Sequence, residues 1–106
     1  MYDSRRACAL NDAFRSTFLG GQVVVTAGVK ALPDIAELLR HVREFTEFNS
    51  DNDPYKEHDF GMILHRDRRV LFKIDYFDID MHEGSPDPAD SSVTRRVLTV
   101  MLADEY

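Results

Sequence analysis

The sequence contains no tryptophan, a single cysteine and no long apolar run. Because Cys8 is the only thiol, it has no partner for an internal disulfide and cannot supply an all-thiolate metal site. No segment approaches the roughly 20 apolar residues that a membrane helix needs. The first residues, MYDSRRACALNDAF, also lack the continuous apolar segment of a signal peptide. We therefore expect a cytoplasmic protein that does not contact a membrane.

The chain has fewer basic than acidic residues, and the difference is confined to one part of the sequence. The net charge is −6, and residues 49–90 hold eleven Asp and Glu residues against five Lys and Arg residues. The rest of the chain holds eight of each kind, so the whole negative excess lies in residues 49–90. Such a surface repels nucleic acid and attracts cationic partners. Direct binding of nucleic acid is therefore not expected.

The apolar content is sufficient for one folded core. A hydrophobic fraction of 43% excludes a mainly disordered chain. A length of 106 residues is near the common size of a single domain. Since neither a repeat nor a linker interrupts the sequence, we expect one domain that spans residues 1–106.

Three elements are predicted in the first half of the chain. Apolar spacing predicts an amphipathic helix over residues 4–18, which ends at a pair of glycines. The β-branched segment QVVVTAGV, residues 22–29, predicts a buried strand. Residues 33–48 carry the clearest helical pattern, because Pro33 suits a first turn and apolar residues then recur every three or four positions.

The second half begins with a predicted β-hairpin, in which DFGMILH and VLFKIDYF flank the charged turn RDRR. Beyond a proline-rich segment, helical spacing favours a final helix, although the letters VLTV are rich in β-branched residues. The apolar residues with this spacing are Val93, Val97, Leu98, Met101 and Leu102. The predicted fold is therefore α+β, in the order α-β-α-β-β-α, with a small three-stranded sheet and packed helices.

The predicted hairpin places His65 opposite Val70, and its two faces follow by counting outward. One face is nearly all apolar and is expected to contact the helices. The other face carries Lys73 and Asp75 and is expected to be only partly covered. In this register His58 lies diagonal to Asp75, within side-chain reach.

Two interpretations of this predicted contact remain open. A histidine oriented by a carboxylate is half of a general-base arrangement. His58, Asp59 and Asp75 are therefore candidate catalytic residues of a small hydrolase or metal-dependent enzyme. The same side chains, together with Lys73, also fit a polar patch that only fixes the register of the hairpin. No serine or cysteine nucleophile is placed beside them by the sequence.

The stretch DYFDIDMHEGSPDPAD, residues 75–90, carries six carboxylates and no Lys or Arg. Asp78, Asp80 and His82 alternate, so on an extended chain their side chains point the same way. Carboxylates and imidazole bind divalent cations, which makes these three residues a candidate metal site. Their order does not match a calcium loop, which needs Gly at its sixth position and Glu at its twelfth. The simpler alternative is a solvated loop.

Four blocks carry a family resemblance: LNDAFR, DNDPYKEHDFG, FKIDYFD, and GSPDPAD followed by VTRRVLTVMLADEY. Through them, nearly the whole chain resembles a domain-of-unknown-function family of short alphaproteobacterial proteins, often found in plasmid or mobile-element surroundings. This sequence has Lys56 where the family usually has Gly, and Phe77 where it has a second Tyr. The resemblance implies a small accessory protein of mobile DNA, a setting rich in inhibitors such as anti-restriction and anti-CRISPR proteins. It implies no catalytic residue.

Charge and resemblance together favour a non-enzymatic protein that binds and inhibits a basic partner, such as a nucleic-acid-handling defence complex. Its expected contacts are the carboxylates after the hairpin, with two aromatic side chains as anchors. These residues are Asp75, Tyr76, Phe77, Asp78, Asp80, Glu83, Asp87 and Asp90. No cofactor is expected.

Overall fold

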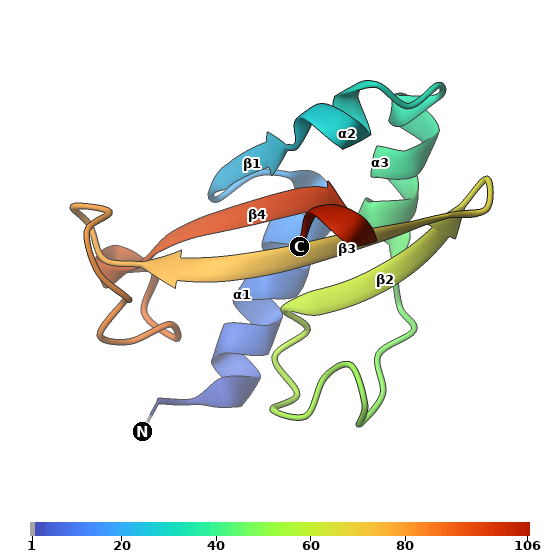
Figure 1. Ribbon diagram of the computed structural model, residues 1–106. Coiled ribbons are helices and arrows are strands. Elements are labelled where there is room, and N and C mark those ends of the chain that lie inside the picture. The colour runs from blue at the N-terminus through green and yellow to red at the C-terminus, as the bar shows by residue number, and fades with distance from the viewer. Residues whose placement is uncertain (1) are drawn as a thin grey trace.

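The computed structural model describes residues 2–106, which form helices packed on one four-stranded sheet (Figure 1). The helices are α1 (Ser4–Thr17), α2 (Ala27–Lys30) and α3 (Ile35–Glu44), and the strands are β1 (Gln22–Val25), β2 (Phe60–His65), β3 (Arg68–Phe77) and β4 (Arg95–Leu102). Short 3-10 turns, η1 (Ser91–Val93) and η2 (Ala103–Glu105), flank β4. The sheet order is β1-β4-β3-β2, with β1 parallel to β4 and the other pairs antiparallel. The predicted α+β class is confirmed.

The last strand is the largest difference from the prediction, because Arg95–Leu102 form β4 rather than a helix. β4 lies between β1 and β3 and pairs with both. Leu98 and Val100 are buried on the helix side, whereas Met101 is buried on the opposite face. A strand with apolar residues on both faces has a nearly continuous apolar sequence, so its spacing also matched a helix. The predicted three-stranded sheet and the predicted element order are therefore wrong.

Element boundaries also differ from the prediction in the first half of the chain. The predicted strand over residues 22–29 is divided, because β1 ends at Val25 and Thr26 caps the short helix α2 by accepting a hydrogen bond from the Val29 amide. The helix predicted over residues 33–48 is shorter, since α3 runs from Ile35 to Glu44. The segment after α3 is irregular, and its aromatic side chains pack toward the sheet.

The hairpin exists, but its turn is shorter than RDRR. Arg66 and Asp67 both have positive φ, 48° and 65°, as the two central residues of a type I′ turn require. His65 therefore pairs with Arg68 rather than with Val70. The true register differs from the predicted one by two residues, and a shift of two leaves every side chain on its predicted face.

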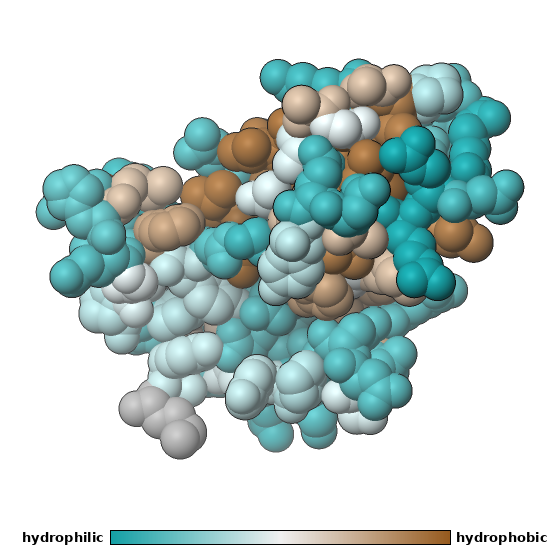
Figure 2. All heavy atoms as spheres, viewed as in Figure 1, coloured by the Kyte–Doolittle hydropathy of each residue, from teal (hydrophilic) through white to brown (hydrophobic). Residues whose placement is uncertain are grey.

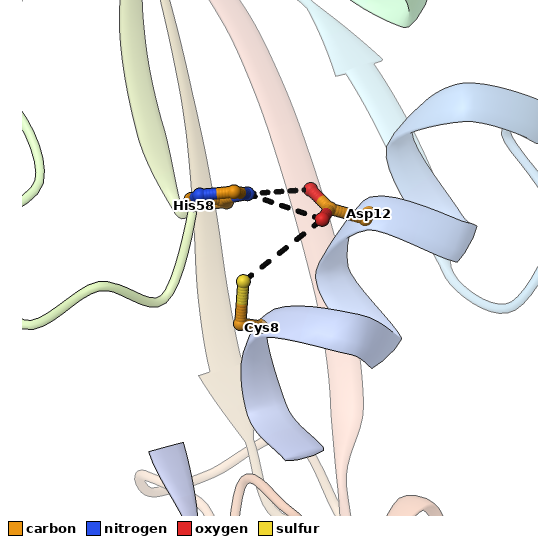
Figure 3. Close-up of side chains that lie close together, drawn as sticks. All are labelled: Cys8, Asp12 and His58. Carbon is orange, nitrogen blue, oxygen red and sulfur yellow. Dashed lines mark hydrogen bonds and ion pairs between the residues drawn. The ribbon is translucent and has the colours of Figure 1, made fainter. Parts of the chain in front are cut away.

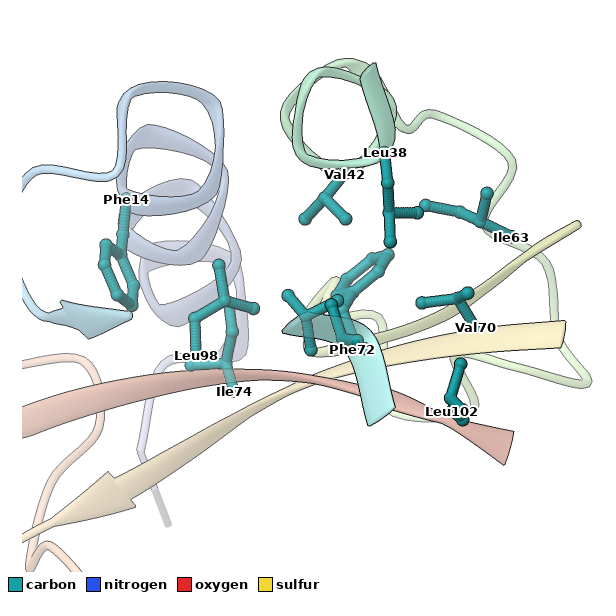
Figure 4. Close-up of a cluster of buried hydrophobic side chains, with 11 residues drawn as sticks. Phe14, Leu38, Val42, Ile63, Val70, Phe72, Ile74, Leu98 and Leu102 are labelled. Atoms are coloured by element: carbon teal, nitrogen blue, oxygen red, sulfur yellow. The ribbon is translucent and has the colours of Figure 1, made fainter. Parts of the chain in front are cut away.

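The core lies between α1, α3 and one face of the sheet (Figure 4). It contains Phe14, Val29, Leu38, Val42, Ile63, Val70, Phe72, Ile74, Leu98, Val100 and Leu102. Gly61 is required in β2, because a Cβ there would lie 2.4 Å from the ring of Phe72. On the opposite face the side chains of Met62 and Leu64 are exposed. The predicted division into a covered and a partly covered face is confirmed.

The surface is unevenly polar. In Figure 2, apolar atoms gather around β1 and α2, whereas the loop that follows β3 is mainly hydrophilic. No helix within residues 2–106 has both the length and the hydrophobicity to cross a bilayer.

Candidate functional site

Residues 78–90, the acidic lobe, form a projecting loop at the end of the sheet where β3 stops (orange in Figure 1). Its backbone is held by its own carboxylates. Asp78 Oδ1 accepts a hydrogen bond from the His82 amide at 3.0 Å, and Asp87 Oδ1 accepts one from the Ala89 amide at 3.0 Å. Hydrogen bonds from Ser92 likewise keep the pKa of Asp90 below its ordinary value. These three carboxylates therefore fold the lobe.

Two other carboxylates of the lobe are free. Within residues 2–106, Asp80 and Glu83 are exposed and have no ion-pair partner. Beside them, the side chains of Ile79 and Met81 are 44% and 42% exposed. The tip of the lobe thus presents free negative charge next to exposed apolar side chains.

The remaining predicted partner contacts, Asp75, Tyr76 and Phe77, lie on β3. Asp75 and Phe77 are on one face of the sheet and Tyr76 is on the other. Asp75 forms an ion pair with Lys73 at 2.8 Å, and Phe77 pairs with Arg95 across the sheet. Tyr76 packs on the helix side, where its hydroxyl group is hydrogen-bonded. As a partly buried side chain on the helix side of the sheet, Tyr76 is not part of the same surface as the lobe.

The geometry proposed for a metal site at Asp78, Asp80 and His82 is wrong. The segment turns instead of extending, with Met81 at a φ of 61° and the Asp78 carboxylate bound to the His82 amide. Alternate side chains therefore do not share a direction. In the part of the chain that the structure describes, ligand atoms of three such residues converge at Cys8, Asp12 and His58 instead.

The contact proposed between His58 and Asp75 is also wrong. His58 precedes β2 in a left-handed backbone conformation, with φ at 56°, and its ring bonds Asp12. Asp75 bonds Lys73. Asp59 continues the pairing with β3, since its carbonyl oxygen accepts the Ile74 amide at 2.8 Å. Burial raises the pKa of the Asp59 carboxyl, and the charge of Glu57 adds to the shift.

A buried polar network joins α1 to the sheet. Asn11, which is fully buried, accepts a hydrogen bond from Arg96 Nε at 2.8 Å and donates to the Tyr76 hydroxyl group at 2.7 Å. The Tyr76 hydroxyl group donates to Glu57 Oε1 at 2.6 Å. Burial and this hydrogen bond raise the pKa of Tyr76. Arg96, in the segment predicted as the final helix, lies on β4 with its guanidinium over the Tyr76 ring, and burial lowers its pKa.

The candidate site lies on the neighbouring surface of α1, where Cys8 and Asp12 are one helical turn apart and share a face (Figure 3). His58 reaches them from the loop before β2. Its Nδ1 atom lies 2.9 Å from Asp12 Oδ1 and 3.1 Å from Asp12 Oδ2, and Cys8 Sγ lies 3.9 Å from Asp12 Oδ2. One sulfur atom, one carboxylate group and one imidazole nitrogen therefore lie close together on this surface.

The imidazole of His58 is held in place from three directions. The Phe48 ring stacks on it with centroids 3.9 Å apart and planes 4° apart. Asp53, which is buried, accepts a hydrogen bond from the His58 amide at 3.1 Å, and its other oxygen lies 3.7 Å from Nε2. Asp12 binds the remaining ring nitrogen. Both nitrogens therefore face carboxylates.

The thiol beside this pair is protonated at neutral pH. Burial raises the pKa of Cys8 to about 11, and the charges of Asp12 and Asp53 add to the shift. Since the thiolate is the nucleophilic form, Cys8 alone is a weak nucleophile. A thiol can still become a ligand of a cation, because a bound cation displaces the proton.

Two surface cavities both include His58 in their lining. One, of about 410 Å³, is bounded by α1 and the end of α3 and includes Asp12, Arg15 and His58 in its lining. The other, of about 300 Å³, is formed by residues 48–58 and includes Asp53 and His58. Small ligands therefore have access to the imidazole.

A family model described as "Protein of unknown function (DUF3768)" matches residues 25–105. The chain belongs to this family. The DUF3768 match includes Asp53, His58 and the acidic lobe, and α1 with Cys8 and Asp12 precedes it. No curated protein and no solved structure matches the chain.

The site in this DUF3768 protein was not predicted from the sequence, because its three residues are not neighbours in the chain. The spacing of Cys8 and Asp12 on a predicted helix was a visible signal. The third member, His58, is 46 positions from Asp12 and follows a turn-rich loop. Only the folded positions of Phe48 and Asp53 direct its ring toward α1.

Proposed function

We propose that this DUF3768 protein is a non-enzymatic binding protein that uses the acidic lobe to dock on, and inhibit, a basic protein partner. The class of partner is a nucleic-acid-handling complex of host defence, whose nucleic-acid-binding surface is cationic. One observation supports the proposal most directly. The tip of the lobe exposes free carboxylates, Asp80 and Glu83, beside the apolar side chains of Ile79 and Met81.

A loop that serves only solubility needs charge but no exposed apolar side chains. In protein interfaces, complementary charge accelerates association, and a few side chains buried near the centre supply most of the affinity. The tip of the lobe combines both kinds of group. Asp80 and Glu83 attract the partner, and Ile79 and Met81 are the anchors that association buries.

The lobe is also organised before binding. The carboxylates of Asp78 and Asp87 hold its backbone, and Ser85 Oγ lies 2.7 Å from Thr94 Oγ1 at its base. A pre-ordered loop loses less conformational entropy on association than a flexible one. This supports direct docking of the lobe without a folding step.

The test reverses the charges of Asp80 and Glu83. It leaves unchanged the carboxylates of Asp78 and Asp87, which hold the backbone of the lobe. The immobilised protein captures partners from a lysate of the native host, and mass spectrometry identifies them. The Asp80→Lys, Glu83→Lys double variant is expected to lose at least about tenfold in affinity for the identified partner. Affinity of the wild type is expected to fall steeply with added salt.

The matched control carries the same charge change elsewhere. Glu47 and Asp51 are exposed and lie outside the lobe, so the Glu47→Lys, Asp51→Lys variant should bind like the wild type. Equal binding by the lobe variant, or equal losses in both variants, would show that the lobe is not the docking surface. Ile79→Ala should weaken binding with little change in its salt dependence.

A further inference from the structure

We propose that Cys8, Asp12 and His58 form a binding site for a divalent transition-metal ion, with Zn²⁺ as the expected occupant. One donor atom from each residue lies within 4.8 Å of the other two (Figure 3). The donors are sulfur, carboxylate oxygen and imidazole nitrogen. This mixture selects zinc and similar metals over calcium and magnesium, which prefer oxygen ligands alone.

The spacing of the donors is within a few tenths of an ångström of that in tetrahedral coordination for the two distances from Asp12 Oδ2. With bonds of about 2.3 Å to sulfur and about 2.0–2.2 Å to nitrogen and oxygen, two ligands of one zinc ion lie roughly 3.2–3.8 Å apart. The Asp12 Oδ2 atom lies 3.1 Å from His58 Nδ1 and 3.9 Å from Cys8 Sγ. Binding requires side-chain rotations that bring the three atoms, all within 4.8 Å of one another, onto one ion. A fourth position is left for water or an external ligand.

The orientation of His58 is that of a metal ligand. A ligating histidine commonly directs its other ring nitrogen at a carboxylate, which fixes the tautomer and makes the ligand more basic. Here Nδ1 faces the donors on α1, while Nε2 lies 3.7 Å from the buried carboxylate of Asp53. The stacked Phe48 ring fixes the plane of the imidazole.

The charge around the site favours a dication. Asp12, Asp53 and the Cys8 thiolate supply three negative charges, and the nearby Arg15 supplies one positive charge. The remaining two negative charges match one divalent ion. Arg15 binds Asp12 Oδ1 at 2.9 Å, so it leaves Oδ2, the oxygen nearer to the thiol, available to the metal.

Binding involves a balanced proton exchange. The Cys8 S–H bond breaks, a bond between sulfur and the metal forms, and one proton passes to solvent for each ion bound. The carboxylates that disfavour a free thiolate stabilise the cation that replaces the proton. Affinity therefore rises with pH.

The simpler alternative is that Asp12 only forms hydrogen bonds to His58 and Arg15, with Cys8 as a packing residue. Spectroscopy with Co²⁺ separates the two. Metal-free protein is titrated with CoCl₂, and a thiolate-to-cobalt charge-transfer band in the near ultraviolet reports a cobalt–sulfur bond. We expect one ion for each chain, tetrahedral ligand-field bands in the visible, and displacement by added Zn²⁺.

Variants assign the ligands. Cys8→Ser, with Cys8→Ala as a second version, should abolish the charge-transfer band. Asp12→Asn and His58→Gln should each weaken binding by at least about tenfold. Asp53→Asn, which changes a residue that orients His58 and supplies no donor atom to the metal, should weaken it by about tenfold. Circular dichroism confirms that each variant is folded before titration.

The matched controls are Asp80→Asn and His82→Gln, which remove similar groups from the acidic lobe and should bind Co²⁺ like the wild type. The proposal is overturned if the wild type gives no charge-transfer band in excess Co²⁺, or if the band persists in Cys8→Ser. It is also overturned if His58→Gln binds like the wild type.

This inference is independent of the proposed docking function. The Asp80→Lys, Glu83→Lys variant should bind Co²⁺ normally, because it changes no ligand. Cys8→Ser should retain partner binding, because it leaves the acidic lobe unchanged. Either proposal can therefore fail without the other.

Discussion

The carboxylates of the acidic lobe and those beside α1 are held in different ways. In the lobe, Asp78, Asp87 and Asp90 accept hydrogen bonds from backbone amides two to five positions away. Beside α1, Asp12 bonds a histidine 46 positions away, and Glu57 bonds a tyrosine 19 positions away. The first group shapes its own loop, whereas the second joins separate parts of the fold.

This difference decides what each region contributes. Local backbone contacts leave the outer carboxylates Asp80 and Glu83 free, so the lobe presents charge to solvent. In long-range contacts the carboxylates are bonded to side chains of other elements, so their charged oxygens are hydrogen-bonded within the molecule. These contacts also hold side chains at fixed distances. A docking surface suits the first arrangement, and a ligand site with defined geometry suits the second. Substitutions in each region should therefore have different consequences.

The largest effect is expected from breaking the long-range network at Asn11. Asn11→Ala removes the acceptor of the Arg96 Nε–H group and a donor to Tyr76, and so leaves buried polar groups without partners. We expect a loss of about 3 kcal/mol in the free energy of unfolding, measured by urea denaturation.

The matched control is Asn52→Ala in the exposed loop before β2, where the amide bonds only local backbone groups. Its expected cost is about 1 kcal/mol or less. Equal costs for Asn11→Ala and Asn52→Ala would contradict the distinction between long-range and local polar contacts.

A smaller effect is expected from breaking a local contact in the lobe. Asp78→Ala removes the acceptor for the His82 amide and should cost about 1 kcal/mol in the free energy of unfolding. Hydrogen exchange at the His82 amide should accelerate while exchange in β3 and β4 stays slow. Asp80→Ala, which removes no hydrogen bond, should change neither quantity. Faster exchange throughout the sheet would mean that the lobe supports the whole fold.

The smallest effect should appear at Asp59 as a pH dependence. Because burial raises its pKa in the folded state, the folded protein holds this proton more tightly than the unfolded chain does. The associated stability is present below the unfolded value, about pH 3.9, and is lost as pH rises through the folded pKa.

Asp59→Asn should therefore raise the urea midpoint at pH 7 and leave it nearly unchanged at low pH. Asp51→Asn, in an exposed turn, is the matched control and should change neither midpoint. A lower midpoint for Asp59→Asn at pH 7 would mean that the ionised carboxylate stabilises the fold.

The sequence predicted those parts of the fold in which local and tertiary preferences agree. α1, α3 and the hairpin each carry one clear period and one exposed face. β4 does not, because apolar residues lie on both of its faces and fit two periods. The register of the hairpin was missed because two consecutive non-glycine residues, Arg66 and Asp67, adopt positive φ.

The candidate sites differ in the same respect. The acidic lobe was visible because its charges are neighbours in the sequence. The site at Cys8 was not, because its third member, His58, is 46 positions from Asp12 and only the folded chain brings the two together. Cys8 and Asp12 alone, one helical turn apart, do not define a site.

The central position of β4 has a consequence for biosynthesis. Among residues 2–106, β1 has no sheet neighbour other than β4, and its Gln22 pairs with Val97. During synthesis, the backbone N–H and C=O groups of β1 have no strand partner while α3 and the hairpin are completed. Such pairing between distant segments is slow and exposes the chain to aggregation. The nascent chain therefore keeps β1 without a strand partner until β4 has been synthesised.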